Sequence, residues 1–542
     1  MSQSGQDGQR PSTSHTSSET TAQSEASKPP PISIARFWLL CIGVCLGLFL
    51  GMVDTSIVAT SLYAISTEFD NLNDANWVAL SYTLAYMGCA VVFSRISDIT
   101  GRRDAFVTAY IIFVSFSLAC GFAQNMHQLI AFRALQGIGG SGLYSLAIII
   151  LPELSPIHLR ELISAVIGLV VALSGVLGPV LGGLLTDYTT WRWVFWINGP
   201  LGAVSLAIFL LSWPKAKYST TPERQTWKQL DYPGSFLTIT AAVLVAFAFQ
   251  NAGQTPGRGS LSNDWRSALF IAPVVLGLVC WAGLLVWEYA VQNHLSEYFV
   301  PVFPLRIFRS GLYTCGVINT LLLGFPYLML VYVVPLRIQV VGGKSALLGG
   351  VMLLPMLGTV AIGTILGGAV NAKRSVIVET MFVGSCLMLL GCGLLTTLST
   401  STLDSAKLLG FITFCGLGFG LAVTSSTIIP AIKIAPKDYA PAQGILAQLR
   451  VFGGSLGIAA STAIVRAKAS GIPAKFAKRG VQAPELHGPV AKKLYAESFR
   501  NDMIASTAVS GLAVLLAMIT LWQRRNKPRK LPRELVFGRE TK

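Results

Sequence analysis

Long apolar runs restrict what this chain can fold into more than any other feature of its sequence. A helix rises 1.5 Å per residue, so about 20 apolar residues cross a hydrocarbon core roughly 30 Å thick, where every backbone hydrogen bond must be closed. The chain holds about fourteen such runs, which begin near Phe37, Trp77, Ala105, His127, Leu162, Trp193, Tyr232, Ser267, Leu312, Ala346, Val376, Lys407, Gly444 and Met503. The sequence therefore predicts an all-α polytopic membrane protein.

The composition agrees with this prediction and argues against a nucleic-acid-binding protein. Charged residues make up 12% of the 542 residues, against about 25% in soluble domains. The formal net charge is +16, but the basic residues form short clusters between apolar runs rather than one polar face. We therefore expect a lipid bilayer, and no nucleic acid, as the partner of these charges.

The distribution of Lys and Arg predicts how the spans are oriented. An even number of spans puts both termini on one side, and with that side taken as cytoplasmic the inner loops hold more than twice as many Lys and Arg as the short outer loops. The basic stretch 524–530 then also lies inside, whereas the Lys- and Arg-rich stretch 466–500 becomes an outer loop. We expect a multi-pass protein of the plasma membrane with both termini in the cytoplasm.

Polar stretches divide the spans into a 6+2+6 arrangement. The first residues are rich in Ser, Thr, Gln and Pro and have too few apolar groups to fold. Two six-span halves around a midplane site are the usual construction of rocking transporters. The expected parts are a disordered cytoplasmic tail (1–35), a six-helix bundle (36–213), a cytoplasmic linker (214–231), two additional spans (232–290), a second six-helix bundle (291–522) and a basic cytoplasmic tail (523–542).

The loop after the second span places one acid and several arginines at a membrane surface. Gly101 permits a tight turn, and Asp98 can cap a helix or face its positive N-terminus. Arg102 and Arg103 can pair with acids across the loop or with lipid phosphate. These four residues predict a latch at the inner surface, and ordinary positive-inside charge is the alternative.

The spacing of this loop, Asp-x-x-Gly-Arg-Arg, resembles the signature loop of the major facilitator superfamily, although Ser94 stands where that family usually has Gly. The fourth span is similar to the family's Arg-x-x-Gln-Gly pattern through Arg133, Gln136 and Gly137. The equivalent inner loop of the second half, 368–374, keeps positive charge but has no acid. The matches follow one another in the family's order, so chance is a poor explanation.

Further segments resemble particular branches of that family. Asp54 with the four residues after it (54–58), and the segment 191–200, look like motifs of the fourteen-span drug:proton antiporter branch. The fifth span is similar to the motif of the exporter branches, which here consists of Gly175, Gly178, Pro179, Gly182 and Gly183. The resemblance covers roughly residues 37–522. It implies a major facilitator fold that works as a monomer and exchanges protons for small amphipathic drugs, toxins or secondary metabolites, as fungal-type efflux transporters do.

Asp54 and Arg133 are the candidates for proton coupling. Asp54 lies about 25 Å into the first span, which ascends from the inner surface, and Arg133 lies about 9 Å into the fourth span, which descends from the outer surface. The two residues therefore lie at nearly the same depth in the membrane. We expect no other acid to lie so deep. Intramembrane ionisable residues usually face a cavity or a partner. Burial favours a neutral carboxyl and a nearby guanidinium favours a charged one, so a change in their separation would load or release a proton. A static structural pair or a capping Asp is the alternative.

The fifth-span motif predicts a close contact between helices. Its glycines remove side chains from one helix face, and Pro179 frees a carbonyl and bends the helix. We expect a tight seam that prevents leak and sets the direction of transport, and plain packing is the alternative.

Arg450, early in the thirteenth span, is a candidate cavity residue of the second half. The alternative is a side chain that snorkels to the inner interface. Aromatic and thioether side chains suit an apolar ligand, and the candidates are Tyr82, Tyr86, Phe325, Tyr327 and Met356.

Other functions lack the residues they need. The five histidines lie at span ends or in loops, and the sequence has no metal-ligand spacing, nucleophile motif or phosphate-binding loop of an ATP-driven pump. We therefore expect no enzyme, no metal and no cofactor. Two alternatives stay open: a proton-coupled importer of a specific solute such as a siderophore, and a nutrient sensor without transport activity.

Overall fold

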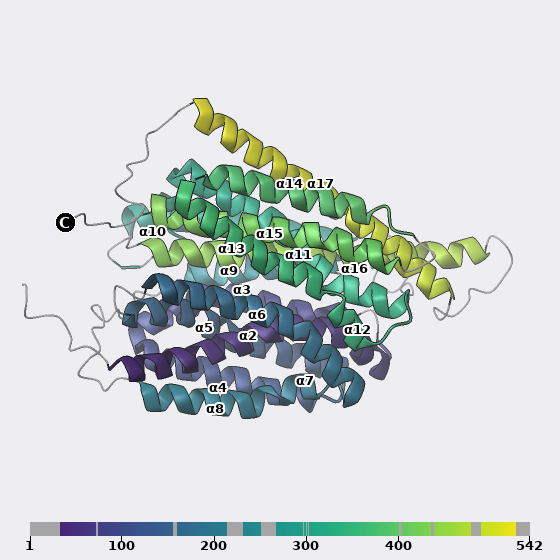
Figure 1. The fold of residues 1–542 in the computed structure, drawn as a ribbon, viewed down its shortest axis with the longest axis horizontal. Coiled ribbons are helices and arrows are strands. Elements are labelled where there is room, and N and C mark those ends of the chain that lie inside the picture. The colour runs from purple at the N-terminus through teal and green to yellow at the C-terminus, as the bar shows by residue number, and fades with distance from the viewer. Residues whose placement is uncertain are drawn as a thin grey trace, which may run out of the picture.

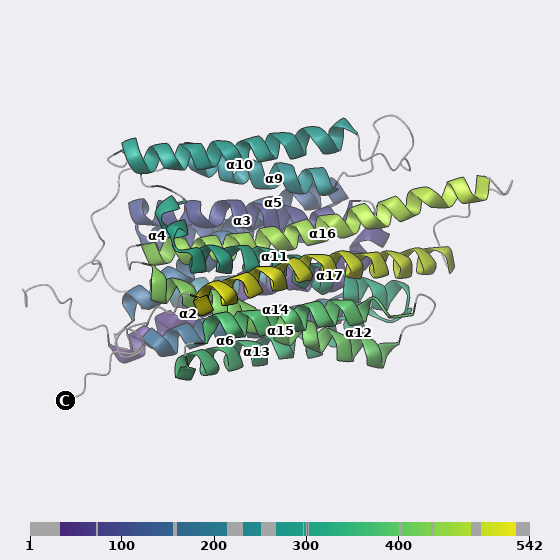
Figure 2. The same cartoon turned by 90° about the horizontal axis from the view of Figure 1, so that it is seen from above.

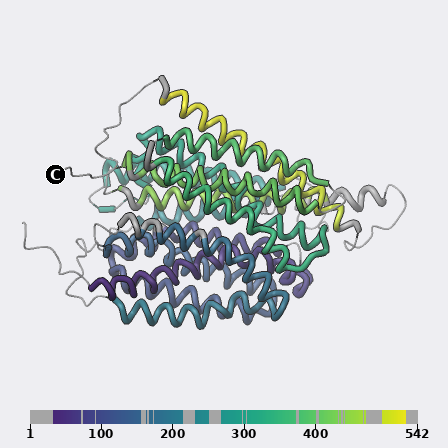
Figure 3. Tube along the Cα trace, in the orientation of Figure 1, coloured from purple at the N-terminus to yellow at the C-terminus, as the bar shows by residue number. Residues whose placement is uncertain are grey.

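The computed structural model describes residues 33–71, 74–155, 160–213, 231–250, 267–295, 298–299, 301, 303–374, 376–399, 404–434, 438–477 and 489–526 (Figure 3). Most of the predicted N-terminal tail, the predicted linker and most of the basic C-terminal tail lie outside these described residues. The division into parts therefore stays a prediction at those three places.

Every regular element in the described ranges is a helix. The elements are α2 (Ile34–Glu68), α3 (Ala75–Thr100), α4 (Arg102–Gly121), α5 (Met126–Leu154), α6 (Arg160–Tyr188), α7 (Trp193–Trp196), α8 (Asn198–Ser212), α9 (Tyr232–Gln250), α10 (Ala268–His294), the 3-10 helix η4 (Leu305–Arg309), α11 (Gly311–Val340), α12 (Ala346–Val351), α13 (Leu354–Arg374), α14 (Ile377–Leu395), α15 (Ser405–Lys433), α16 (Tyr439–Ala477) and α17 (Pro489–Asn526).

The helices are long and apolar enough to make this a multi-pass membrane protein. Thirteen spans are found among the described residues, and α3 adds a fourteenth if its two parts, which meet at an angle of 46°, count as one. The prediction of an all-α polytopic protein is confirmed. The grouping of the spans as 6+2+6 stays a prediction.

The helices run side by side in two groups (Figures 1 and 2). Helices α2 to α8 form one half of the bundle and α11 to α17 the other, with α12 packed against α6. Helices α9 and α10 pack on each other, and α9 also contacts α3 and α16. We call the end of the bundle where α2 begins and α17 ends the near end, and the opposite end the far end (Figure 1).

Helices α2 and α11 join the two halves. Apolar side chains of α2, such as Ile57 and Leu62, share one buried cluster with those of α11, such as Leu330 and Val334. Hydrogen bonds cross the same contact: the Tyr332 hydroxyl donates to the Thr55 carbonyl at 2.6 Å, and the Gln339 amide donates to the Thr60 carbonyl at 3.2 Å. These bonds place the middle of α2 at the boundary between the halves.

The predicted outer loop 466–500 is wrong for most of its length. Helix α16 continues to Ala477, and α17 begins at Pro489 rather than near Met503. Both helices project beyond the rest of the bundle at the far end (Figure 2). An ion pair between Lys468 and Glu497, 3.0 Å long, joins their polar extensions. A helix does not need an apolar surface once it leaves the bilayer, because charged residues that form helices well can continue it in water.

Two predicted spans are interrupted. The run from Trp193 is divided into α7 and α8, and the run from Ala346 is divided into α12 and α13. In each case a proline lies in the first turn of the second helix, Pro200 in α8 and Pro355 in α13. Proline has no N–H to donate, and in the first turn of a helix no intrahelical hydrogen bond is lost by its absence.

Glycines of the fifth-span motif form the contact between α6 and its neighbours. A Cβ added at Gly178 would collide with the Ser56 side chain of α2, and one at Gly183 would meet the backbone of Leu347 in α12 at 2.5 Å. Gly182 lies equally close to α2. Gly175 differs, because nothing lies within 4 Å of an added Cβ. Helix α6 continues as one helix through Pro179, so the proline does not interrupt the span.

Gly178 and Gly175 supply a matched test of this contact. We expect Gly178→Val to lower the free energy of unfolding by about 1–3 kcal/mol, the usual cost of overpacking, because the new side chain has no room beside α2. Gly175→Val is the control, because it makes the same change of residue type in the same helix at a position where the added side chain has open space. It is expected to leave the free energy of unfolding unchanged. Thermal unfolding of the purified variants in one detergent measures both, and equal stabilities would contradict the packing described.

Candidate functional site

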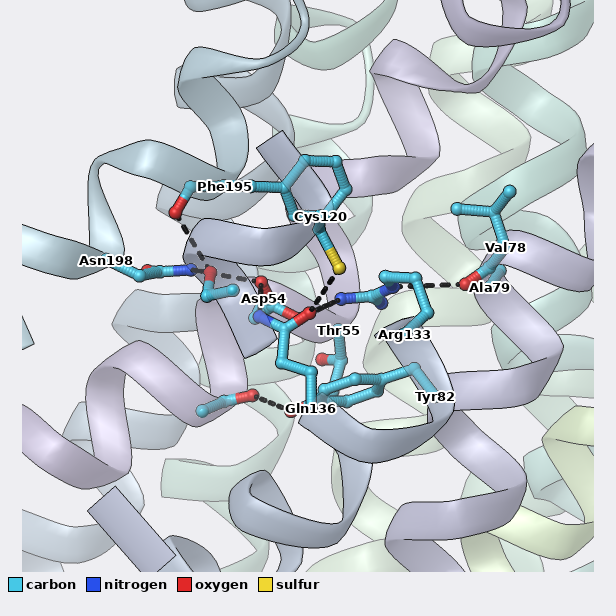
Figure 4. A network of polar contacts seen from close by, with 12 residues as sticks. Asp54, Thr55, Val78, Ala79, Tyr82, Cys120, Arg133, Gln136, Phe195 and Asn198 are labelled. Atoms are coloured by element: carbon cyan, nitrogen blue, oxygen red, sulfur yellow. Dashed lines mark hydrogen bonds and ion pairs between the residues drawn. The ribbon is translucent and has the colours of Figure 1, made fainter. Parts of the chain in front are cut away.

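Asp54 is the centre of a buried polar network in the first half of the bundle. It lies in the interior of α2, and its side chain is fully buried. Arg133 and Gln136 of α5 and Asn198 of α8 surround it (Figure 4). The sequence places these residues 79 to 144 positions from Asp54, so only the folded bundle brings them together.

All three partners donate hydrogen bonds to the Asp54 carboxylate. One guanidinium nitrogen of Arg133 forms an ion pair with Oδ2. The Gln136 and Asn198 side-chain amides donate to Oδ1 at 3.0 and 3.1 Å. Only donors converge on the two oxygens, which is the hydrogen-bonding pattern that an ionised carboxylate can accept.

Arg133 is held from several sides as well. Its Nε donates to the Val78 carbonyl of α3 at 3.1 Å, and Nη1 donates to the Gln136 side-chain oxygen at 2.8 Å. The guanidinium carbon lies 4.2 Å from the centroid of the Tyr82 ring, a cation–π arrangement. The second terminal nitrogen, Nη2, is buried and has no hydrogen-bond partner. The guanidinium therefore has one donor to spare in this conformation.

A further layer of polar contacts orients the partners. Asn198 also donates to the Ser117 hydroxyl of α4 at 2.9 Å, and that hydroxyl donates to the Phe195 carbonyl of α7 at 2.9 Å. The Tyr82 hydroxyl donates to the Gly51 carbonyl of α2 at 3.0 Å. The site is thus built at the place where α2, α3, α4, α5 and α8 meet.

Arg450 lies between the halves. It is half-buried, about 16 Å along α16 from its first residue, and its Nε is buried without a hydrogen-bond partner. Its neighbour Gln448 donates to the Met87 carbonyl of α3 at 3.0 Å, and a Cβ added at Gly324 of α11 would lie 2.2 Å from the Arg450 carbonyl. The cavity role of Arg450 and the snorkelling alternative both stay predictions.

Aromatic rings lie around this arginine. Tyr86 is flanked by Tyr82 and Tyr144, with ring centroids 6.1 and 5.9 Å apart. In the other half, Tyr327 stacks on Phe419 with centroids 3.8 Å apart. Of the predicted candidates, Tyr82, Tyr86 and Met356 are buried inside the protein.

The predicted latch at the near end is made by Arg102 and two acids. Arg102 contacts Asp98 at 2.5 Å and donates two hydrogen bonds to Glu153 of α5, at 2.9 and 3.0 Å. Gly101 turns the chain between α3 and α4 with φ at +99°, a conformation that favours glycine. The side chain of Arg103 is 51% exposed and approaches only Asp104, at 3.8 Å.

Three buried polar residues have no functional role predicted from the sequence. Asn198 carried no assigned role, although it lies within the segment that resembles the antiporter branch. Besides Asp54, two acids within the described helices are buried, Asp502 of α17 and Glu288 of α10, and the expectation that no acid lies as deep in the membrane as Asp54 stays a prediction. Asp502 was overlooked because the basic stretch before it predicted a loop, and Glu288 is predicted from the sequence to be interfacial because it lies close to the end of its helix. Among the described residues, no group of three or more His, Cys, Asp or Glu could hold a metal ion.

Comparisons with known proteins agree on one family. A sequence profile of the Major Facilitator Superfamily matches residues 44–257. The chain is 31% identical to the MFS-type transporter FPY5 of Fusarium mangiferae, over 92% of this chain and 85% of that protein. It is also 31% identical to the efflux pump FUS6 of Gibberella moniliformis, over 82% and 77%. A crystal structure of a bacterial homologue of the human lysosomal transporter Spinster has the same fold, with a TM-score of 0.61 and 15% identity, and the match covers 90% of this chain and 97% of that one.

A double-mutant cycle tests the network around Asp54. We expect either Asp54→Asn or Arg133→Gln to lower the free energy of unfolding by about 3–5 kcal/mol, because each leaves the other charge buried and unpaired. The double variant has no charge left at this site, so its loss is expected to be smaller than the sum of the two. Unfolding in detergent measures the cycle, and additive losses would show that the two charges do not stabilise each other.

Arg102 and Arg103 provide a second matched pair. Loss of the Arg102 contacts, which are partly exposed, is expected to lower the local stability of the loop by about 1 kcal/mol. In the Arg102→Gln variant the backbone amide hydrogens near Gly101 are therefore expected to exchange roughly fivefold faster. Arg103→Gln leaves exchange unchanged. Hydrogen–deuterium exchange of the peptide that spans the loop is the measurement, and equal rates in both variants would contradict the latch.

Proposed function

Because the chain belongs to the major facilitator superfamily, a family of membrane transporters, we propose that it is a secondary transporter that exports small amphipathic organic compounds in exchange for protons. The observation that carries the proposal is the fully buried Asp54, whose two oxygens accept only from donors of neighbouring helices. Similarity to proteins named efflux pumps supports export.

The proposed coupling uses competition between a proton and Arg133 for the Asp54 carboxylate. In this conformation Arg133 neutralises the carboxylate, so no proton is needed. If Arg133 moves away, an isolated buried carboxylate is unfavourable and takes up a proton. The spare Nη2 donor and the face of Tyr82 offer Arg133 other interactions when it leaves Asp54.

The exchange is linked to the movement of the two halves through α2. Thr55, the residue after Asp54, accepts the hydrogen bond from Tyr332 of the second half. A displacement of α2 that separates Asp54 from Arg133 also changes this contact. Proton binding and the opening of the boundary between the halves would then be two aspects of one movement.

The proposed substrate region is the boundary around Arg450. Tyr86, Tyr144, Tyr327 and Phe419 offer flat apolar faces from both halves, and Arg450 adds one positive charge. Such a surface suits molecules that have aromatic or aliphatic parts and a few polar groups. We propose that the protein works as a monomer in the plasma membrane, with both termini in the cytoplasm and protons and a small molecule as its partners.

Retention of a lipophilic dye tests the function. The protein, its Asp54→Asn variant and a control variant, Asp104→Asn, are produced at matched levels in cells that lack their own efflux pumps. Asp104 is 68% exposed, so the control makes the same chemical change outside the network. We expect dye loss that stops on addition of a protonophore, that is at least tenfold slower in Asp54→Asn, and that is unchanged in Asp104→Asn.

The other outcomes separate the alternatives. Export that is unaffected by the protonophore would remove proton coupling from the proposal. Unchanged dye retention in every arm would contradict broad export and direct attention to uptake of a specific solute such as a siderophore.

A further inference from the structure

A second buried carboxyl lies in the half of the bundle opposite Asp54. Asp502 of α17 is 1% exposed, although it belongs to no motif that the sequence identified. The Ser461 hydroxyl of α16 donates to its Oδ2 at 2.9 Å. Its other oxygen, Oδ1, is buried and has no hydrogen-bond partner.

A small cavity, apolar over most of its lining, adjoins Asp502. Asp502 lines a cavity of about 10 Å³ between α11, α16 and α17, close to the minimum volume for one water molecule. Two more polar atoms of its lining are buried without a hydrogen-bond partner, Oγ of Ser498 and Nε of Arg337. Three unsatisfied polar groups around one space are costly unless something binds there.

The charges around this cavity differ from those around Asp54. From α11, Arg337 lines the space, but its guanidinium donates to the Ser399 carbonyl at 2.6 Å and lies 4.6 Å from the Phe499 ring, and no described cation is within 4 Å of Asp502. From α17 the other titratable group is Tyr495.

The remaining neighbours bring no further charge to the cavity. From α16 only Ser461 and Val465 line it, and Lys468 pairs with Glu497 instead. Helix α14 also packs against α17. Its one charged residue, Glu379, forms an ion pair with Arg524, and its two cysteines do not line the cavity. A buried carboxyl without a counter-charge favours its neutral form.

We propose that Asp502, together with Ser461, Ser498 and Arg337, forms a second proton-binding site that holds one proton and has room for one water molecule. This inference rests on the proposed function for its role in transport, whereas proton binding itself does not depend on it. In the conformation described here, Asp502 carries a proton while Asp54 is ionised and paired with Arg133.

The position of the site gives it a distinct part in the cycle. Arg337 is three residues from the end of α11, about 4.5 Å along the helix axis, whereas Asp54 is fourteen residues from the end of α2, about 21 Å. Both helices end at the far end of the bundle. Asp502 thus lies closer to the far-side solution than Asp54 does, and it takes up its proton from that side.

Infrared spectroscopy of the purified full-length protein in lipid nanodiscs tests proton binding directly. The carbonyl stretching band of protonated carboxyl groups is recorded across a pH series for the unmodified protein, Asp502→Asn, Asp54→Asn and Asp104→Asn. We expect a band at neutral pH that disappears as the pH rises, that is missing in Asp502→Asn and that persists in the two other variants. A neutral-pH band that is unchanged in Asp502→Asn would overturn the proposal.

A second variant keeps the test independent of folding defects. Ser461→Ala leaves the carboxyl in place but removes the one donor that stabilises its ionised form, so the band is expected to persist to higher pH. An unchanged titration would contradict the assignment of the band to Asp502.

Transport measurements then separate this inference from the proposed function. With dye export as the readout, Asp502→Asn is expected to remove the dependence of the export rate on far-side pH, whereas Asp54→Asn abolishes proton-driven export. If export proves not to be proton-driven, the proposed function fails while the infrared result still decides whether Asp502 binds a proton. A far-side pH dependence that is intact in Asp502→Asn would overturn the role in the cycle.

Discussion

The ion pair between Asp54 and Arg133 is the interaction on which the first half of the bundle depends. Removing two charges from water is costly, and their attraction offsets this cost only when the remaining polar atoms are also satisfied. Gln136, Asn198 and the Val78 carbonyl satisfy most of them. Five helices must therefore approach one point, and small residues permit it: a Cβ at Gly137 would lie 2.5 Å from the Tyr82 carbonyl.

The contacts between the halves have a different character. Tyr332 and Gln339 of α11 donate single hydrogen bonds to backbone carbonyls of α2. Nearby, the Asp187 carboxylate of α6 accepts from the backbone N–H groups of Ala346 and Leu347 at 3.2 and 2.8 Å, at the N-terminus of α12, where a negative charge is favoured. Each bond costs little to break on its own, in contrast to the buried pair, which suits halves that separate and rejoin.

Two carboxyl groups in opposite halves thus meet opposite environments. Asp54 has a guanidinium and two amides around it, whereas Asp502 has one hydroxyl donor and no described cation within 4 Å. We propose that the same residue type is stabilised as an ion in one half and as a neutral acid in the other. This asymmetry gives a transporter of the proposed kind two places where proton binding can respond to movement.

The sequence by itself determined that the chain crosses a membrane many times, because apolar length is a local property that needs no partner. It also identified Asp54 and Arg133, since a charge within an apolar run is conspicuous wherever the run packs. It did not determine which helix faces meet, because spans that are apolar on all sides carry no periodic signal of their buried face. Only the tertiary structure decided that Asn198 reaches Asp54, that Glu153 joins the loop acid Asp98 in holding Arg102, and that Asp502 is buried, because these contacts depend on the rotation and extension of helices that are far apart in the chain.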